Sequence, residues 1–170
     1  MAILDAELEF ASAQVIPSGN QNAIASTNRV DLGSAIDVGA GEIVYVVFTT
    51  LVDVVASAGT PRQGHWFVAG ATDAAFTLGI RMLGSTPPMG DVFHFGGALP
   101  IAFTTYVVPV QPLQRSDNNV IVQPTTCRYL QCYYRNLDSA TTNYAAQTWR
   151  IYATLTPPEM GRIYPASTSS

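Results

Sequence analysis

The chain has 170 residues, which is enough for one domain with a substantial core. Charged residues make up only 12% of it, about half the usual share, so we expect either a surface partly covered by a partner or one rich in uncharged polar side chains. The net charge is −4, and all basic residues are arginines scattered from Arg29 to Arg162. Nucleic-acid binding needs concentrated positive charge, so this distribution argues against it.

The first segment has the pattern of a half-buried β-strand. Apolar and acidic residues alternate from Leu4 to Phe10, so one face is apolar and the other carries Asp5, Glu7 and Glu9. Carboxylates spaced about 7 Å apart along one strand are too spread for a calcium cage or a catalytic pair. They form either a solvated acidic face or a stripe that meets basic residues of a partner.

Two long segments are apolar on both faces. Ile43–Leu51 and Ile101–Val110 therefore predict central strands whose outer face meets a loop or a neighbouring subunit. Three further segments, His65–Ala69, Val92–Phe95 and Cys127–Arg135, also predict strands.

Two other segments alternate cleanly between apolar and polar residues. The pattern places four side chains of each segment inward: Phe76, Leu78, Ile80 and Met82 in the first, and Trp149, Ile151, Ala153 and Leu155 in the second. Strong turn residues separate the segments, and no helical periodicity competes. The chain is therefore predicted to be all-β, a jelly roll or β-sandwich of about eight strands with extended N- and C-terminal arms.

Residues 1–156 are predicted to form a single domain, followed by a Pro/Ser-rich C-terminal arm over residues 157–170. The arm holds apolar residues in an otherwise polar tail, which favours docking on its own domain or on a neighbour. We expect no signal peptide, because the N-terminus is acidic and has no apolar core. The uncharged stretch 92–114 is interrupted by prolines and glycines, which argues against a membrane helix.

The residues that usually carry chemistry are few. Cys127 and Cys132 lie five positions apart on one predicted strand, so they are expected on opposite faces, unpaired, buried and reduced. His65 and His94 have no partner at metal-ligand spacing. We expect no catalytic residue, metal or cofactor, and hence a protein that is not an enzyme.

Tyrosines are numerous around the last strands. Tyr129, Tyr133 and Tyr134 share one strand, with Tyr144 and Tyr152 close in sequence. They form either an exposed strip that binds sugars or proteins, or core packing on one face and edge cover on the other.

The order of short motifs along the chain resembles the capsid cement (decoration) proteins of tailed, in particular short-tailed, bacteriophages. The motifs are Leu4-Asp5-Ala6, Ala25-Ser26-Thr27-Asn28, Asp31-Leu32-Gly33, Asp37-Val38-Gly39, Tyr45-Val46-Val47, Ala69–Phe76 and Tyr129-Leu130. The resemblance implies a jelly roll on the outer surface of the mature virion head, where it bridges neighbouring major capsid proteins after synthesis in the host cytoplasm. It also implies a homo-oligomer, either dimer or trimer, without nucleic acid or membrane partners.

The two arms are the expected contact segments with the capsid or with another subunit. Their candidate interface residues are Leu4, Asp5, Glu7, Glu9, Met160, Arg162, Ile163 and Tyr164. The chain departs from the family by a Pro-rich insertion around Ser85–Met89 and by the tail after Pro158. The alternative function is a jelly-roll carbohydrate-binding module of a phage spike or fibre, used in host adhesion. An enzyme on this fold, such as a cupin, needs a histidine cluster that two separated histidines do not supply.

Overall fold

A computed structural model of the chain describes residues 8–19, 21, 23–38, 44–58, 64–78, 80–89, 99–110, 125–136 and 143–155. The regular elements in these residues are β-strands, and the prediction of an all-β sandwich is confirmed. The eight strands of five or more residues are β1 (Glu9–Ile16), β3 (Val30–Val38), β4 (Val44–Thr50), β6 (Gly64–Ala71), β7 (Arg81–Ser85), β8 (Thr105–Val110), β9 (Thr125–Asn136) and β11 (Gln147–Thr154). Shorter elements are β2 (Ile24–Ala25), β5 (Ala56–Ala58) and β10 (Asn143–Tyr144). The predicted strand Val92–Phe95 and the predicted arm 157–170 lie outside the described residues.

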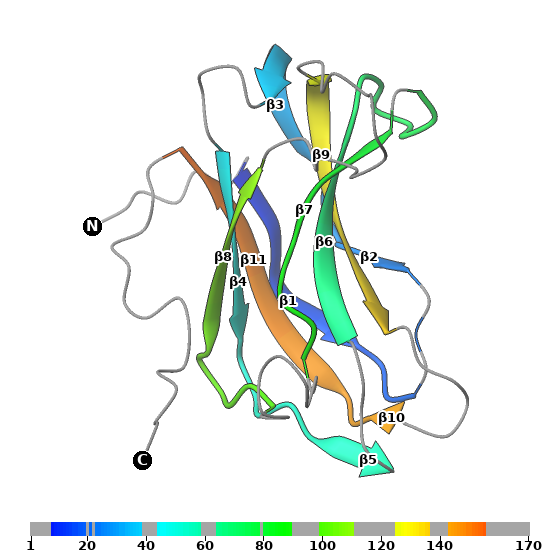
Figure 1. The fold of residues 1–170 in the computed structure, drawn as a ribbon, viewed down its shortest axis with the longest axis vertical. Helices are drawn as coiled ribbons and strands as arrows, with labels where there is room; N and C mark the ends of the chain where they lie inside the picture. The colour runs from blue at the N-terminus through cyan, green and yellow to red at the C-terminus, as the bar shows by residue number, and fades with distance from the viewer. Residues whose placement is uncertain are drawn as a thin grey trace, which may run out of the picture.

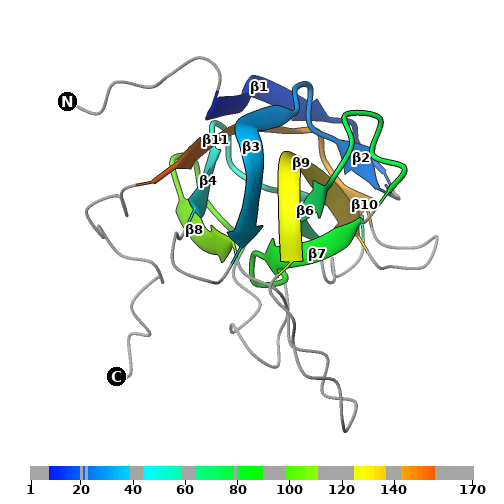
Figure 2. The same cartoon turned by 90° about the horizontal axis from the view of Figure 1, so that it is seen from above.

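Two antiparallel sheets face each other (Figures 1 and 2). One has the strand order β1-β11-β4-β8. In the other, β9 lies between β6 and the successive strands β2 and β3, and β7 pairs with the far side of β6. The short strands β5 and β10 pair with each other at the lower end of the view in Figure 1.

The strand β4 is central, as its composition predicts. It pairs with β11 on one side and β8 on the other, and Val47 is buried although it lies on the outward face. The matching prediction for Ile101–Val110 is wrong. Its strand begins only at Thr105, and β8 ends the order of its sheet. Ile101 and Phe103 lie in the preceding loop. The prediction failed because local composition does not reveal which strand finds a partner on both sides.

The strand β11 follows its predicted alternation. Trp149, Ile151 and Ala153 are buried, and Arg150 between them is exposed. Leu155 is the exception: it follows the last residue of the strand and is exposed.

The predicted strand Phe76–Met82 is wrong in its first half. The carboxylate of Asp73 accepts hydrogen bonds from the backbone N–H groups of Thr77 and Leu78 and holds this segment as a turn. Such bonds from a side chain compete with strand pairing. The strand β7 starts at Arg81, and Leu78, Ile80 and Met82 are exposed while Phe76 alone is buried.

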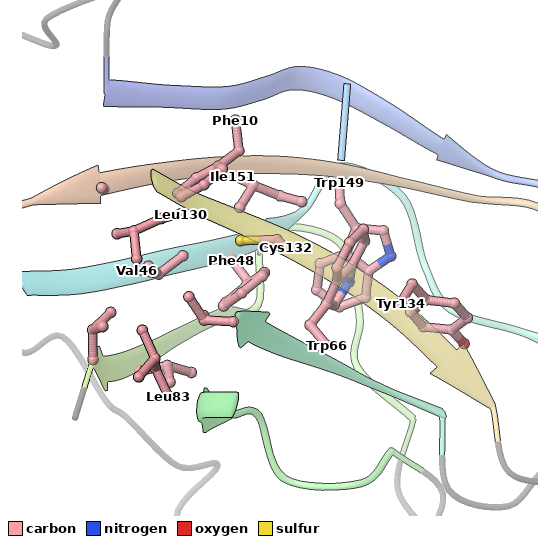
Figure 3. Close-up of a cluster of buried hydrophobic side chains, with 14 of the residues drawn as sticks. Phe10, Val46, Phe48, Trp66, Leu83, Leu130, Cys132, Tyr134, Trp149 and Ile151 are labelled. Atoms are coloured by element: carbon pink, nitrogen blue, oxygen red, sulfur yellow. The ribbon is translucent and has the colours of Figure 1, made fainter. Parts of the chain in front are cut away.

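The core between the sheets is built around aromatic rings (Figure 3). The ring of Trp66 stacks on Phe48 at 5.6 Å between centroids and meets Tyr134 and Trp149 edge-on at 5.4 and 6.0 Å. The indole of Trp149 donates to Gln147 Oε1, and Gln147 Nε2 donates to the Tyr134 hydroxyl. The polar side chains of Gln147, Tyr134 and Trp149 are therefore paired inside the core, which limits their desolvation penalty. The buried indole N–H of Trp66 has no hydrogen-bond partner among the described residues.

Both thiols lie in that core and are free, as predicted. They do not lie on opposite faces, so that expectation is wrong. The pairing of β3 with β9 shifts its register between the Asp31–Tyr129 pair and the Ile36–Cys127 pair. At this shift two successive residues of β9, Arg128 and Tyr129, are both only partly buried. Such an irregularity changes the phase of the alternation. Cys127 therefore faces the same interior as Cys132.

The two sheets are joined along both sides of the sandwich. On one side β7 lies so close to β8 that a Cβ at Gly84 would come within 2.6 Å of Val108 Cγ1. On the other side, Ser26 N–H donates to the Cys132 carbonyl of one sheet and Asn28 N–H to the Phe10 carbonyl of the other. Loops connect the strands at the two ends of this sandwich (Figure 1).

Candidate binding surfaces

Of the eight interface residues predicted from the sequence, the structure describes Glu9. It opens β1 opposite Tyr152, is partly buried, and its carbonyl accepts a hydrogen bond from Asn28 Nδ2 at 3.3 Å. Its neighbour Phe10 is fully buried, so the predicted in–out alternation is confirmed at this point. The other seven residues lie outside the described residues: Leu4, Asp5, Glu7, Met160, Arg162, Ile163 and Tyr164.

The predicted tyrosine strip divides between interior and surface. Tyr134 and Tyr144 are buried, where Tyr144 donates to the Met89 carbonyl at 2.9 Å. Burial raises the pKa of Tyr134 well above its ordinary value. Tyr129 and Tyr133 face outward from the same strand and are half-buried. For Tyr134 and Tyr144, the interpretation as core packing is therefore confirmed.

An aromatic cluster covers the outer face of β6 and β9. Phe67 and Tyr133 stack at 5.4 Å between centroids, and Phe76 meets Tyr133 edge-on at 6.4 Å. The Arg29 guanidinium lies over the Phe76 ring at 5.3 Å and donates to the Ala74 carbonyl. These rings contact one another, which leaves less of their faces for a ligand.

An ion pair holds β3 to β9 beside the register slip. Arg128 Nε and Nη2 each donate to the Asp31 carboxylate at 2.8 Å, and the guanidinium lies over the Tyr129 ring at 5.1 Å. Arg128 and the Gly33 backbone N–H lower the pKa of Asp31. The pair is partly exposed, so its main effect is to orient the edge of the sheet.

Figure 1 shows two loops at the lower end of the sandwich, residues 51–55 and 99–104. They carry four exposed apolar residues: Val52, Val55, Ile101 and Phe103. We call this set the lower patch. Phe103 N–H donates to the Thr50 carbonyl, Val54 N–H to the Pro100 carbonyl and Ala102 N–H to Asp53 Oδ1, at 2.7 to 2.9 Å. The loops are therefore fixed to each other through their backbones.

The conformation of Phe103 is unusual. Thr104 N–H donates to the Ile101 carbonyl and closes a turn in which Phe103 has φ +65°, in the left-handed region that favours glycine. The side chain is 74% exposed, and that of Ile101 is 70% exposed. A strained backbone that carries an exposed aromatic ring is a feature of binding sites more than of structural loops.

A second set of exposed apolar residues lies at the opposite end, on the connection between β6 and β7 and at the start of β7 (Figure 1). It consists of Leu78, Ile80 and Met82, which we call the upper patch. Asp73 fixes this connection through its bonds to Thr77 and Leu78, which lower the pKa of its carboxyl.

The two patches offer exposed apolar side chains for binding by contact. Among the described residues, no group of three or more histidine, cysteine or acidic side chains lies close enough to hold a metal ion. Burial raises the pKa of Cys127 to about 11 and that of Cys132 well above its ordinary value, so both thiols are poor nucleophiles at neutral pH. No helix long and apolar enough to cross a bilayer occurs in the described part of the chain.

Comparisons with known proteins add no relative: no protein-family model matches the chain, and no curated protein matches it. The two end patches were missed by the sequence analysis, which placed Ile101 and Phe103 and the whole upper patch in strands and made no prediction for Val52 and Val55. The sequence held one signal for the lower patch: apolar residues follow Pro100 directly, in a segment without glycine.

Proposed function

We propose that this chain is a structural virion protein, a cement protein that binds the outer surface of a mature phage head and bridges neighbouring major capsid proteins. The motif order in the sequence supports this proposal. The structural observation that supports it is the pairing of the long strands, from which the jelly roll implied by the resemblance can be inferred.

The eight long strands pair in a nested way, from which we infer a jelly roll. The first pairs with the last (β1 with β11), the second with the seventh (β3 with β9), the third with the sixth (β4 with β8) and the fourth with the fifth (β6 with β7). Successive pairs alternate between the two sheets. A nested hairpin rolled into two facing sheets in this way is the topology of jelly rolls, which occur both in viral capsid proteins and in lectins.

A cement protein works by binding, without a reaction. A clamp that binds the expanded shell and not its precursor adds its binding free energy to the stability of the expanded state. Several contacts on a symmetric lattice add avidity, since the second contact becomes intramolecular. The N- and C-terminal segments 4–9 and 160–164 are the proposed arms that reach neighbouring subunits.

The alternative, a carbohydrate-binding module of a spike or fibre, takes second place. Sugar rings bind to aromatic faces that are open to solvent. In the described outer face of β6 and β9, Tyr133 lies between Phe67 and Phe76, so its ring is used within the protein.

The proposal is tested by co-sedimentation of the purified protein with phage heads stripped of it, in precursor and expanded forms. We expect saturable binding to expanded heads and a higher temperature of head rupture. Binding to neither form would contradict the proposal, and a glycan array would then test the alternative.

A further inference from the structure

The lower and upper patches lie at opposite ends of one rigid sandwich (Figure 1). Each is apolar and exposed, and each is held by backbone hydrogen bonds: Phe103 N–H to the Thr50 carbonyl below, Thr72 N–H to the Leu78 carbonyl above. Because the loops are already ordered, docking on them costs little additional conformational entropy. The residues of both patches are exposed and are not members of the main core cluster.

The charges beside the two patches are opposite in sign. In the loops of the lower patch, residues 51–55 and 99–104, the charged side chain is the exposed Asp53. Beside the upper patch, the exposed Arg81 lies between Ile80 and Met82 in the sequence and donates through Nη1 to the Ile80 carbonyl, and Arg29 donates to the Ala74 carbonyl of the same connection. Asp73 lies in the same region, but both of its carboxylate oxygens accept hydrogen bonds from Thr77 and Leu78 in its own loop, whereas Asp53 accepts the Ala102 N–H through Oδ1.

We propose that the lower patch of one copy docks on the upper patch of a second copy, so that the protein self-associates head to tail. Apolar side chains then cover each other and Asp53 faces Arg81. In a two-fold contact of the lower patch with itself, Asp53 would instead meet Asp53, and like charges disfavour that arrangement. A head-to-tail contact closes into a ring or continues as an open chain, depending on the rotation between copies. The inference goes beyond the proposed function and needs no capsid for its test.

The first experiment is sedimentation velocity of the full chain from micromolar to several hundred micromolar concentration. We expect reversible association that Phe103→Gly and, separately, Met82→Ser each weaken by about tenfold or more in dissociation constant, because both remove part of a central apolar contact. Phe103→Gly suits the left-handed turn, so the fold is kept. Val15→Ser is the matched control: Val15 is also exposed but belongs to neither patch, and its association should equal that of the unaltered chain.

The second experiment distinguishes head-to-tail from two-fold contact. Each variant keeps one intact patch, so an equimolar mixture of Phe103→Gly and Met82→Ser should form heterodimers at a concentration at which each variant alone sediments as a monomer. Any of three results would overturn the inference. The unaltered chain could stay monomeric throughout, Met82→Ser could leave association unchanged, or the mixture could form no heterodimers. Failure of capsid binding with intact self-association would count against the proposed function alone.

Discussion

Phe103 combines two unfavourable properties at one position. Its left-handed backbone costs about 1–2 kcal/mol for a residue with a Cβ, and its ring stays in water. Hydrogen bonds of Thr50 with Ile101, Phe103 and Thr104 hold the turn despite that cost. Stability alone therefore does not explain a phenylalanine here, which is why we assign the side chain to a binding surface.

Comparing Phe103→Gly with Phe103→Ala separates strain from contact. Both remove the exposed ring, but only glycine relieves the left-handed backbone, so we expect Phe103→Gly to be more stable by about 1 kcal/mol. Urea unfolding followed by the fluorescence of the two buried tryptophans measures the difference. Equal stability of the two variants would show that the turn is not strained.

At the scale of elements, the sandwich depends on the close approach of β7 and β8, which belong to different sheets. Gly84 makes this approach possible, because a side chain there would meet Val108 Cγ1 at 2.6 Å and the Pro109 carbonyl oxygen at 3.0 Å. The second neighbour is backbone and cannot turn away.

We therefore expect Gly84→Ala to destabilise the fold by about 1–3 kcal/mol through overpacking. The adjacent Ser85→Ala is the control, since Ser85 is exposed and its change should stay within about 0.5 kcal/mol. Thermal or urea unfolding compares them. A Gly84→Ala protein as stable as the control would mean that β7 and β8 can separate without loss.

The proposed arms are elements of function more than of stability. Deleting Pro158–Ser170 should weaken head binding or oligomer formation by about tenfold or more through lost avidity, while the domain stays folded. Co-sedimentation with expanded heads measures the first effect and sedimentation velocity the second. Unchanged values in both assays would remove the arm hypothesis.

The N-terminal acidic stripe makes a separate prediction. The triple replacement Asp5→Asn, Glu7→Gln and Glu9→Gln should lower the affinity for phage heads. High salt should weaken head binding by the unaltered protein in the same way, because exposed charge pairs are screened. If affinity depends on neither the replacement nor salt, the stripe is a solvated face.

At the scale of the whole molecule, buried thiol and tyrosine hydroxyl groups lower the free energy of unfolding at high pH. Burial raises the pKa of Cys127 from 9.0 to about 11 and that of Tyr106 from 10.0 to about 12. Above pH 9 the unfolded chain loses these protons first, so the folded state binds more protons and the free energy of unfolding falls as pH rises. These groups have no effect below that range.

We expect urea midpoints, followed by circular dichroism, to decline steadily between pH 9 and 12. Tyr106→Phe removes one of the titrating groups and should flatten the upper part of the decline. Midpoints that are equal at pH 8 and pH 11 would contradict the raised pKa values.

Much of the fold was predictable because side chains on a strand alternate with period two whatever lies around them. That rule correctly placed Trp149, Ile151 and Ala153 in the core, identified β4 as a central strand, and indicated an all-β sandwich. Turn residues between the segments were sufficient to count about eight strands.

Tertiary structure alone decided the features that depend on distant partners. The register shift opposite Cys127 turns its side chain toward the interior. The Asp73 carboxylate accepts backbone hydrogen bonds that keep Phe76–Leu78 out of a strand. At the edge of its sheet, β8 is preceded by a loop in which Ile101 and Phe103 are exposed. Each results from pairing or hydrogen bonding between particular backbone groups, which a hydrophobic pattern does not encode. The sequence by itself thus determined the class of fold and its main core residues, whereas the surfaces available for binding were decided by register, turn chemistry and strand order.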